Sequence, residues 1–129
     1  MKSLILASLL IGSSAFADTT LFNCVVPSQT NSVKLTVTLA ADQSADFVTV
    51  NLVEKTGTSQ FFTQADKGAI TSQIAQGALQ FLAMTDKTSQ TAEGVITNAG
   101  IFSINKGQDG NFTGLLLANS NIYQLNCTK

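Results

Sequence analysis

Apolar and polar residues alternate one by one over long parts of the chain. In residues 32–40 the odd positions are Val or Leu, and the even positions between them are Lys or Thr. Residues 47–54 alternate in the same way, with Val48, Val50 and Leu52 on one side. Because neighbouring side chains of a β-strand point to opposite faces, this period of two predicts two strands that each bury one face.

Shorter alternating runs, separated by polar turns, occupy most of the remaining chain. Asp109-Gly110 marks the clearest of these turns, because both residue types tolerate positive φ. The pattern predicts an all-β fold, namely a single antiparallel β-barrel or β-sandwich of about 7–9 short strands. The shorter runs lie at 21–26, 59–63, 78–84, 93–97, 100–104, 112–117 and 122–127.

The stretch at 66–84 does not follow a single period. Ile70 and Ile74 are four residues apart, as on one face of a helix. We therefore expect a short helix near residues 67–76, or an irregular crossing, before the strand pattern returns. The polar residues at 85–90 then predict a loop.

Residues 1–17 have the features of a signal peptide: a lysine next to the start, an apolar run at 4–11, and the small-x-small site Ala15-Phe16-Ala17. Cleavage there leaves one exported β-domain at 18–129. The apolar run is shorter than the roughly 18 residues of a spanning helix, so we expect no transmembrane segment after cleavage. The short leader and compact length are typical of a bacterial protein that is delivered to the periplasm or the medium.

The chain has two cysteines, Cys24 and Cys127, one in the first alternating run and one in the last. Two cysteines in an exported protein usually pair. We therefore predict a disulfide that links the first strand to the last, which places these strands side by side. A loop of about 100 residues corresponds to roughly 4–5 kcal/mol of stabilisation.

The composition excludes several classes of function. The chain has no arginine, and after residue 17 its six lysines and eight acidic residues give a net charge of −2. Nucleic acids and anionic lipids require a basic surface, so neither is an expected partner. There is no histidine, no free thiol once the cysteines pair, and no glycine-rich phosphate loop. We therefore expect no cofactor, no metal site and no catalytic residue.

Two pairs of residues remain as candidates for chemistry or binding. Glu54 and Glu93 are the only glutamates, and two carboxyl groups across a cleft can hydrolyse glycosides. Both lie at predicted strand ends, where solvated charges are the usual case. Phe61 and Phe62 are adjacent aromatic residues that point to opposite faces of a strand, so we expect one buried and the other exposed or covered. We expect the second ring to pack beneath residues 66–77; the alternative is that Phe61 and Phe62 form a partner contact, because aromatic residues often anchor interfaces.

The layout, an exported β-domain with a cysteine near each end, resembles in outline the small periplasmic lysozyme-inhibitor barrels. Their Ser-Gly-x-x-Tyr type loop is absent, because the chain has no Ser-Gly pair and its one tyrosine, Tyr123, lies in the last predicted strand. The resemblance implies an inhibitor by analogy only and assigns no site residue.

Together these observations favour a non-enzymatic, monomeric exported domain that binds a protein or a small apolar ligand. The alternative is an envelope-associated structural or inhibitor protein, and a carboxylate-based hydrolase is third. A ligand-binding barrel needs an apolar cavity, and a hydrolase needs two carboxylates in one cleft. An interaction module needs a contiguous exposed patch, which we expect around Phe61, Phe62 or Leu82.

Overall fold

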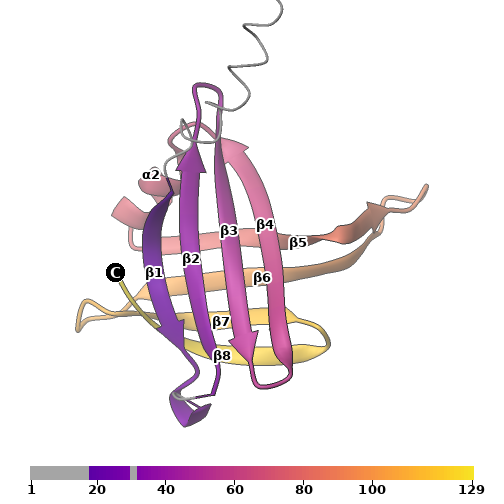
Figure 1. Ribbon diagram of the computed structural model, residues 1–129. Coiled ribbons are helices and arrows are strands. Elements are labelled where there is room, and N and C mark those ends of the chain that lie inside the picture. The colour runs from indigo at the N-terminus through magenta and orange to yellow at the C-terminus, as the bar shows by residue number, and fades with distance from the viewer. Residues whose placement is uncertain (1–17, 30–31) are drawn as a thin grey trace, which may run out of the picture.

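Eight antiparallel strands close into a barrel in the computed structural model, which describes residues 18–29 and 32–129 (Figure 1). Each strand pairs with the next along the chain, and β1 pairs with β8. The predicted all-β antiparallel fold is confirmed, in its barrel form. The predicted signal peptide lies outside the described residues. The elements are β1 (Thr19–Val25), the 3₁₀ turn η1 (Pro27–Gln29), β2 (Lys34–Ala41), β3 (Ala45–Glu54), β4 (Gly57–Asp66), α2 (Ala69–Ala75), β5 (Ala78–Gln90), β6 (Ile96–Lys106), β7 (Phe112–Ala118) and β8 (Asn121–Thr128).

The barrel consists of two four-stranded halves, and in Figure 1 strands β1–β4 run across strands β5–β8. Within a half, neighbouring strands pair along most of their length; β3 and β4, for example, pair at ten positions. The two seams between the halves are much shorter. Strands β1 and β8 pair at three positions, and β4 and β5 pair at one, Phe62 with Met84. The β4–β5 seam is therefore where the wall of the barrel is most open.

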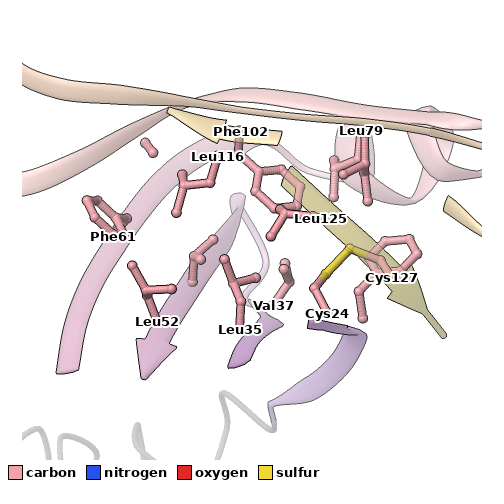
Figure 2. Packing of buried hydrophobic residues seen from close by; sticks show 14 of the residues in the cluster. Cys24, Leu35, Val37, Leu52, Phe61, Leu79, Phe102, Leu116, Leu125 and Cys127 are labelled. Carbon is pink, nitrogen blue, oxygen red and sulfur yellow. A yellow bond between two sulfur atoms is a disulfide. The ribbon is translucent and has the colours of Figure 1, made fainter. Parts of the chain in front are cut away.

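The interior of the barrel is an apolar core built from every second residue of the strands. The inward positions predicted in the run 47–54 are fully buried. Phe22 and Phe112 pack edge to face with ring centroids 4.8 Å apart, while Phe81 and Phe102 stack at 4.9 Å. Burial of each large apolar side chain contributes roughly 1.5–3 kcal/mol to stability. Figure 2 shows the side chains of the two halves meeting in this core.

A disulfide joins Cys24 to Cys127 across the β1–β8 seam, which confirms the predicted pairing. The two residues lie directly opposite each other in the register, with Cα atoms 4.0 Å apart and 103 residues apart in sequence. Both are buried in the core, where the sulfur–sulfur bond is visible in Figure 2. The disulfide therefore reinforces a seam in which only three residue pairs join the two strands.

Helix α2 confirms the short helix predicted near residues 67–76. Gly68 precedes it and Gly77 follows it, both with positive φ, a conformation in which glycine is not strained. Ile70 is buried in the core and Ile74, one turn later, packs against it. The helix lies against β4 and β5. Within the described residues, no helix is long and apolar enough to cross a membrane.

The predicted loop at 85–90 is wrong, because these residues continue strand β5. Strands β5 and β6 extend beyond the barrel as a two-stranded ribbon, drawn in orange in Figure 1, which we call the arm. Their pairing resumes at Ser89 and Gln90 after a bulge. Residues 85–90 of the arm carry polar side chains on both faces because water surrounds them, so they lack the alternation that marks the other strands, while Val95 and Ile96 on the opposite side of the arm are exposed apolar residues.

Candidate functional site

Six apolar side chains form a continuous row across the outer face of the barrel, which we call the apolar stripe. Cross-strand pairing places them next to one another, since partners in a ladder have Cβ atoms about 4.5–5.5 Å apart. Leu82 and Met84 are two residues apart on β5, so their side chains share one face of the strand. The stripe consists of Phe62 on β4, Met84 and Leu82 on β5, Ile101 on β6, Leu117 on β7 and Ile122 on β8.

Much of the stripe is open to solvent. Its exposed fractions are 64% for Ile122, 42% for Phe62, 42% for Ile101 and 40% for Leu117, while Leu82 and Met84 are half-buried. Single exposed apolar residues are common on protein surfaces and need no explanation. A row of six adjacent ones that spans five strands is uncommon and typical of an interaction surface.

The face around the stripe carries no charge. Residues 78–84, 99–105, 112–118 and 121–128 of strands β5–β8 contain no Asp, Glu, Lys or Arg, and the one charged residue paired with them in the barrel is Lys106 at the end of β6. Polar positions on this face, such as Gln80, Ser103 and Gln124, are uncharged. A strongly charged partner would gain no electrostatic attraction here and would lose solvation on contact.

The predicted contact pair is divided between two surfaces. Phe62 belongs to the apolar stripe, whereas Phe61 is only 2% exposed and points into the barrel. Leu82 also lies in the stripe. The patch expected around Phe62 and Leu82 is thus present, and the role of either phenylalanine in binding stays a prediction.

A groove of about 710 Å³ opens beside the stripe, between β4 and β5. It forms because β4 returns to the β3–β4 turn while β5 continues into the arm, so that the strands separate beyond the Phe62–Met84 pair. Asp86 and Lys87 carry the only charges among the described residues that line it. The lining residues are Thr58, Ser59, Gln60, Phe61, Thr85, Asp86, Lys87, Asn98, Ala99, Gly100, Ala118, Asn119 and Ser120.

One wall of the groove is the bulge in β5, which side-chain hydrogen bonds hold in place. The backbone N–H of Thr85 donates to Thr88 Oγ1 at 2.9 Å, and the Thr88 hydroxyl donates to the carbonyl oxygen of Asn98. Asn98 Nδ2 donates in turn to the carbonyl oxygen of Lys87 at 3.2 Å. These bonds occupy backbone groups of the bulge, so they keep β5 away from β4 at this level.

Backbone strain is concentrated at the same groove. In residues 18–29 and 32–129, the non-glycine residues with positive φ are Asn98 at 58°, Asn119 at 54° and Ser120 at 62°, and all three line it. Asn119 and Ser120 form the two-residue β7–β8 turn, which requires this conformation. Asparagine tolerates positive φ, but serine is strained there relative to glycine. Such strain often accompanies binding sites.

The two glutamates do not come together in the fold. Glu54 ends β3 and accepts a hydrogen bond from the Tyr123 hydroxyl at 3.1 Å. Burial, and after it the Glu54 charge, raise the pKa of Tyr123 above its usual value of 10.0. Glu93 lies in the turn between β5 and β6, and neither glutamate lines the groove. Within the described residues, no cluster of three or more potential metal ligands occurs.

Sequence reasoning identified part of the stripe and none of the groove. Ile101 and Leu117 each stand next to a buried apolar residue, so runs such as Leu115-Leu116-Leu117 signalled apolar side chains on both faces of a strand. That signal does not say which residues become neighbours.

The chain was also compared with known protein families, curated proteins and solved structures, and nothing in these comparisons matches it.

Proposed function

We propose that this protein is a small exported, non-enzymatic and monomeric binding module that docks its apolar stripe on an uncharged, apolar surface of a partner protein. The contiguous stripe from Phe62 to Ile122 carries this proposal. It is the kind of patch that an interaction module requires, and it includes Phe62 and Leu82 but not Phe61, which is buried.

A protein partner is favoured over a small apolar ligand by what fills the barrel. Small-ligand sites are enclosed and mostly apolar. Phe22, Phe102 and Phe112 instead occupy the interior as part of a tightly buried core. The stripe is open, and a shallow depression beside Leu82 and Ile101 offers a contact for one side chain of a partner. A few such contacts often supply much of the binding energy of an interface.

The exposed part of the stripe supplies a share of the binding energy of a specific contact. Complete burial of one Leu, Ile or Phe is worth roughly 1.5–3 kcal/mol, so a side chain that is about half exposed contributes roughly 1 kcal/mol. Four such residues give roughly 4 kcal/mol, which matches the lower end of the roughly 4–15 kcal/mol that association costs. Further contacts along the uncharged rim, such as hydrogen bonds, must therefore supply the net affinity. Binding through this neutral face should depend only weakly on salt.

Export is supported by the disulfide, since such bonds persist mainly outside the reducing cytosol. An inhibitor or an envelope-associated structural protein would use the same stripe and would differ in the partner that it meets. No observation on the glutamates favours the hydrolase, because Glu54 is engaged by Tyr123 and Glu93 lies on the arm.

Photo-crosslinking in the producing cell tests this proposal. Benzoylphenylalanine replaces Ile122, the most exposed stripe residue, or Val53, which is 48% exposed on β3 between the polar residues Lys34 and Thr58. We expect a discrete adduct with one protein from position 122 and none from position 53. Equal adducts from both positions, or none from position 122, would contradict the proposal. Mass spectrometry of the adduct then separates an inhibited enzyme from a structural partner.

A further inference from the structure

We propose that the groove between β4 and β5 is a second binding site, which captures an extended, uncharged peptide segment as an additional strand on the free edge of β4. This site is separate from the stripe, because it uses the backbone edge of the sheet rather than its outer face. Strand addition of this kind draws its affinity from main-chain hydrogen bonds and its specificity from alternate side chains.

The backbone of β4 faces the groove with unused hydrogen-bonding groups. In an antiparallel pair, successive residues turn their N–H and C=O groups alternately toward the partner strand and away from it. The two-residue β3–β4 turn makes Glu54 and Gly57 the hydrogen-bonded closing pair, so Thr58, Gln60 and Phe62 face away from β3. Phe62 pairs with Met84 on that side, which agrees with this assignment. Thr58 and Gln60 have no strand opposite them.

The groove is held open by the bulge of β5. Hydrogen bonds from Thr88 and Asn98 fix the bulge of β5, so β5 is prevented from closing on β4. The free edge from Thr58 to Phe61 is four residues long, about 13 Å at the usual rise of a strand. An incoming segment of similar length can therefore pair along this edge. The strained β7–β8 turn at Asn119 and Ser120 limits the groove on its far side.

The lining specifies the chemistry of the segment. Phe61, Gly100 and Ala118 are buried and form an apolar floor, whereas most of the other lining groups are hydroxyls and amides. One charge of each sign, on Asp86 and Lys87, favours a ligand without net charge. The expected segment is extended and neutral, with one apolar side chain directed at Phe61 and polar residues on either side of it.

Amide hydrogen exchange of the intact protein tests the free edge. The N–H groups of Thr58 and Gln60 should exchange rapidly, while those of Ser59 and Phe61, which face β3, should be protected. A phage-displayed library of random octapeptides then supplies the ligand probe. We expect neutral peptides to be enriched, and the best of them to slow exchange at Thr58 and Gln60. Uniform protection along 58–61 in the free protein, or no enrichment, would overturn the proposal.

Variants and modified peptides identify the binding mode. Gln60→Pro removes the N–H that faces the groove and should weaken the selected peptide at least about tenfold, whereas Gln60→Ala keeps that N–H and should weaken it far less. If Gln60→Pro does not fold, N-methylated peptides give the same answer, since methylation at every second position should abolish binding and methylation between them should not. Strand addition would be contradicted if Gln60→Pro and Gln60→Ala weakened peptide binding equally. It would also be contradicted if the effect of N-methylation did not alternate along the peptide.

Two further results separate this site from its alternatives. Maltoheptaose serves as the carbohydrate probe, and slowed exchange at Thr58 and Gln60 with this sugar but not with peptides would replace the proposal by a glycan site. Ile101→Lys, which alters the stripe, should leave the affinity for the selected peptide unchanged, because Ile101 does not line the groove. A result that contradicts peptide binding in the groove is therefore distinguishable from a result that contradicts partner binding by the stripe.

Discussion

At the scale of single residues, Tyr123 links the last strand to the end of β3. Its ring is buried, with 8% of the residue exposed, and its hydroxyl donates to Glu54 and accepts a hydrogen bond from Asn121 Nδ2 at 3.3 Å. A phenolate at this position would lose solvation and would lie beside the Glu54 carboxylate. The folded protein therefore binds the phenolic proton more tightly than the unfolded chain does.

Stability should consequently fall at alkaline pH through this residue. Because the pKa of Tyr123 is raised on folding, its contribution is complete below its ordinary pKa of 10.0 and is lost as the pH rises toward the folded value. We expect Tyr123→Phe to lose about 1–2 kcal/mol of unfolding free energy near pH 7, from the missing hydrogen bond. The difference from the wild type should shrink between about pH 9 and pH 11. Urea unfolding of both proteins at each pH measures this difference in unfolding free energy.

The comparison has an internal control, because the two proteins differ only at residue 123 and the contributions of shared groups cancel in the difference. Tyr123 is the only tyrosine, so its ionisation can also be followed directly by ultraviolet absorbance. A difference that stays constant across this pH range, or an absorbance titration at or below the ordinary pKa, would contradict a buried, proton-retaining Tyr123.

Some residue-level properties were predictable from the sequence and others were not. Val48, Val50 and Leu52 were assigned to the core by their spacing alone, and all are fully buried. The positive φ of Asn98 and Ser120 was not foreseen. Both conformations arise where strands end or bulge, and they depend on the register of the neighbouring strand, which local residue patterns do not encode.

At the scale of elements, the two seams of the barrel are closed in different ways. The β1–β8 seam has three residue pairs and the disulfide, whereas the β4–β5 seam has a single residue pair, Phe62 with Met84. The covalent bond and the short pairing therefore lie on opposite flanks of the β1–β4 half. The disulfide-linked β1–β8 seam keeps the barrel closed, and the β4–β5 seam leaves an edge of β4 available for binding.

Removal of the disulfide should destabilise the fold strongly. The bond closes a loop of 103 residues, for which restriction of the unfolded chain predicts about 4–5 kcal/mol. We expect the double variant Cys24→Ser, Cys127→Ser to lose a free energy of unfolding of this order, and dithiothreitol to have the same effect on the wild type. Urea denaturation measures both. A loss below about 1 kcal/mol would show that the core closes this seam unaided.

Elements with one buried face were predictable, and the arm was not. The run at 32–40 and the helix near residues 67–76 each show a period imposed by burial on one side, so local pattern located them. The residues at 85–90 are polar on both faces because the arm is surrounded by water, and they were assigned to a loop. Only pairing with β6 makes them a strand, and pairing is not visible in a single sequence.

At the scale of the whole molecule, the stripe and the groove are products of register. Ile101, Leu117 and Ile122 are far apart in sequence and become neighbours only when β6, β7 and β8 pair as they do. The groove requires in addition that β4 and β5 separate after one pair. The sequence therefore predicted a patch around Phe61, Phe62 or Leu82 without its other members, and strand pairing in the barrel adds these to Phe62 and Leu82.

The most direct test of the binding proposal combines the crosslinker at position 122 with one further substitution. Ile101→Lys places a charge in the middle of the stripe, and Val53→Lys places the same charge on a similarly exposed aliphatic position of the other half. Both positions are exposed and should tolerate lysine, and thermal unfolding verifies this. The amount of crosslinked adduct in the producing cell should fall at least about tenfold with Ile101→Lys, because a buried unpaired charge opposes docking, and should be unchanged with Val53→Lys. Equal amounts of adduct in the two backgrounds would show that the apolar stripe is not the binding surface.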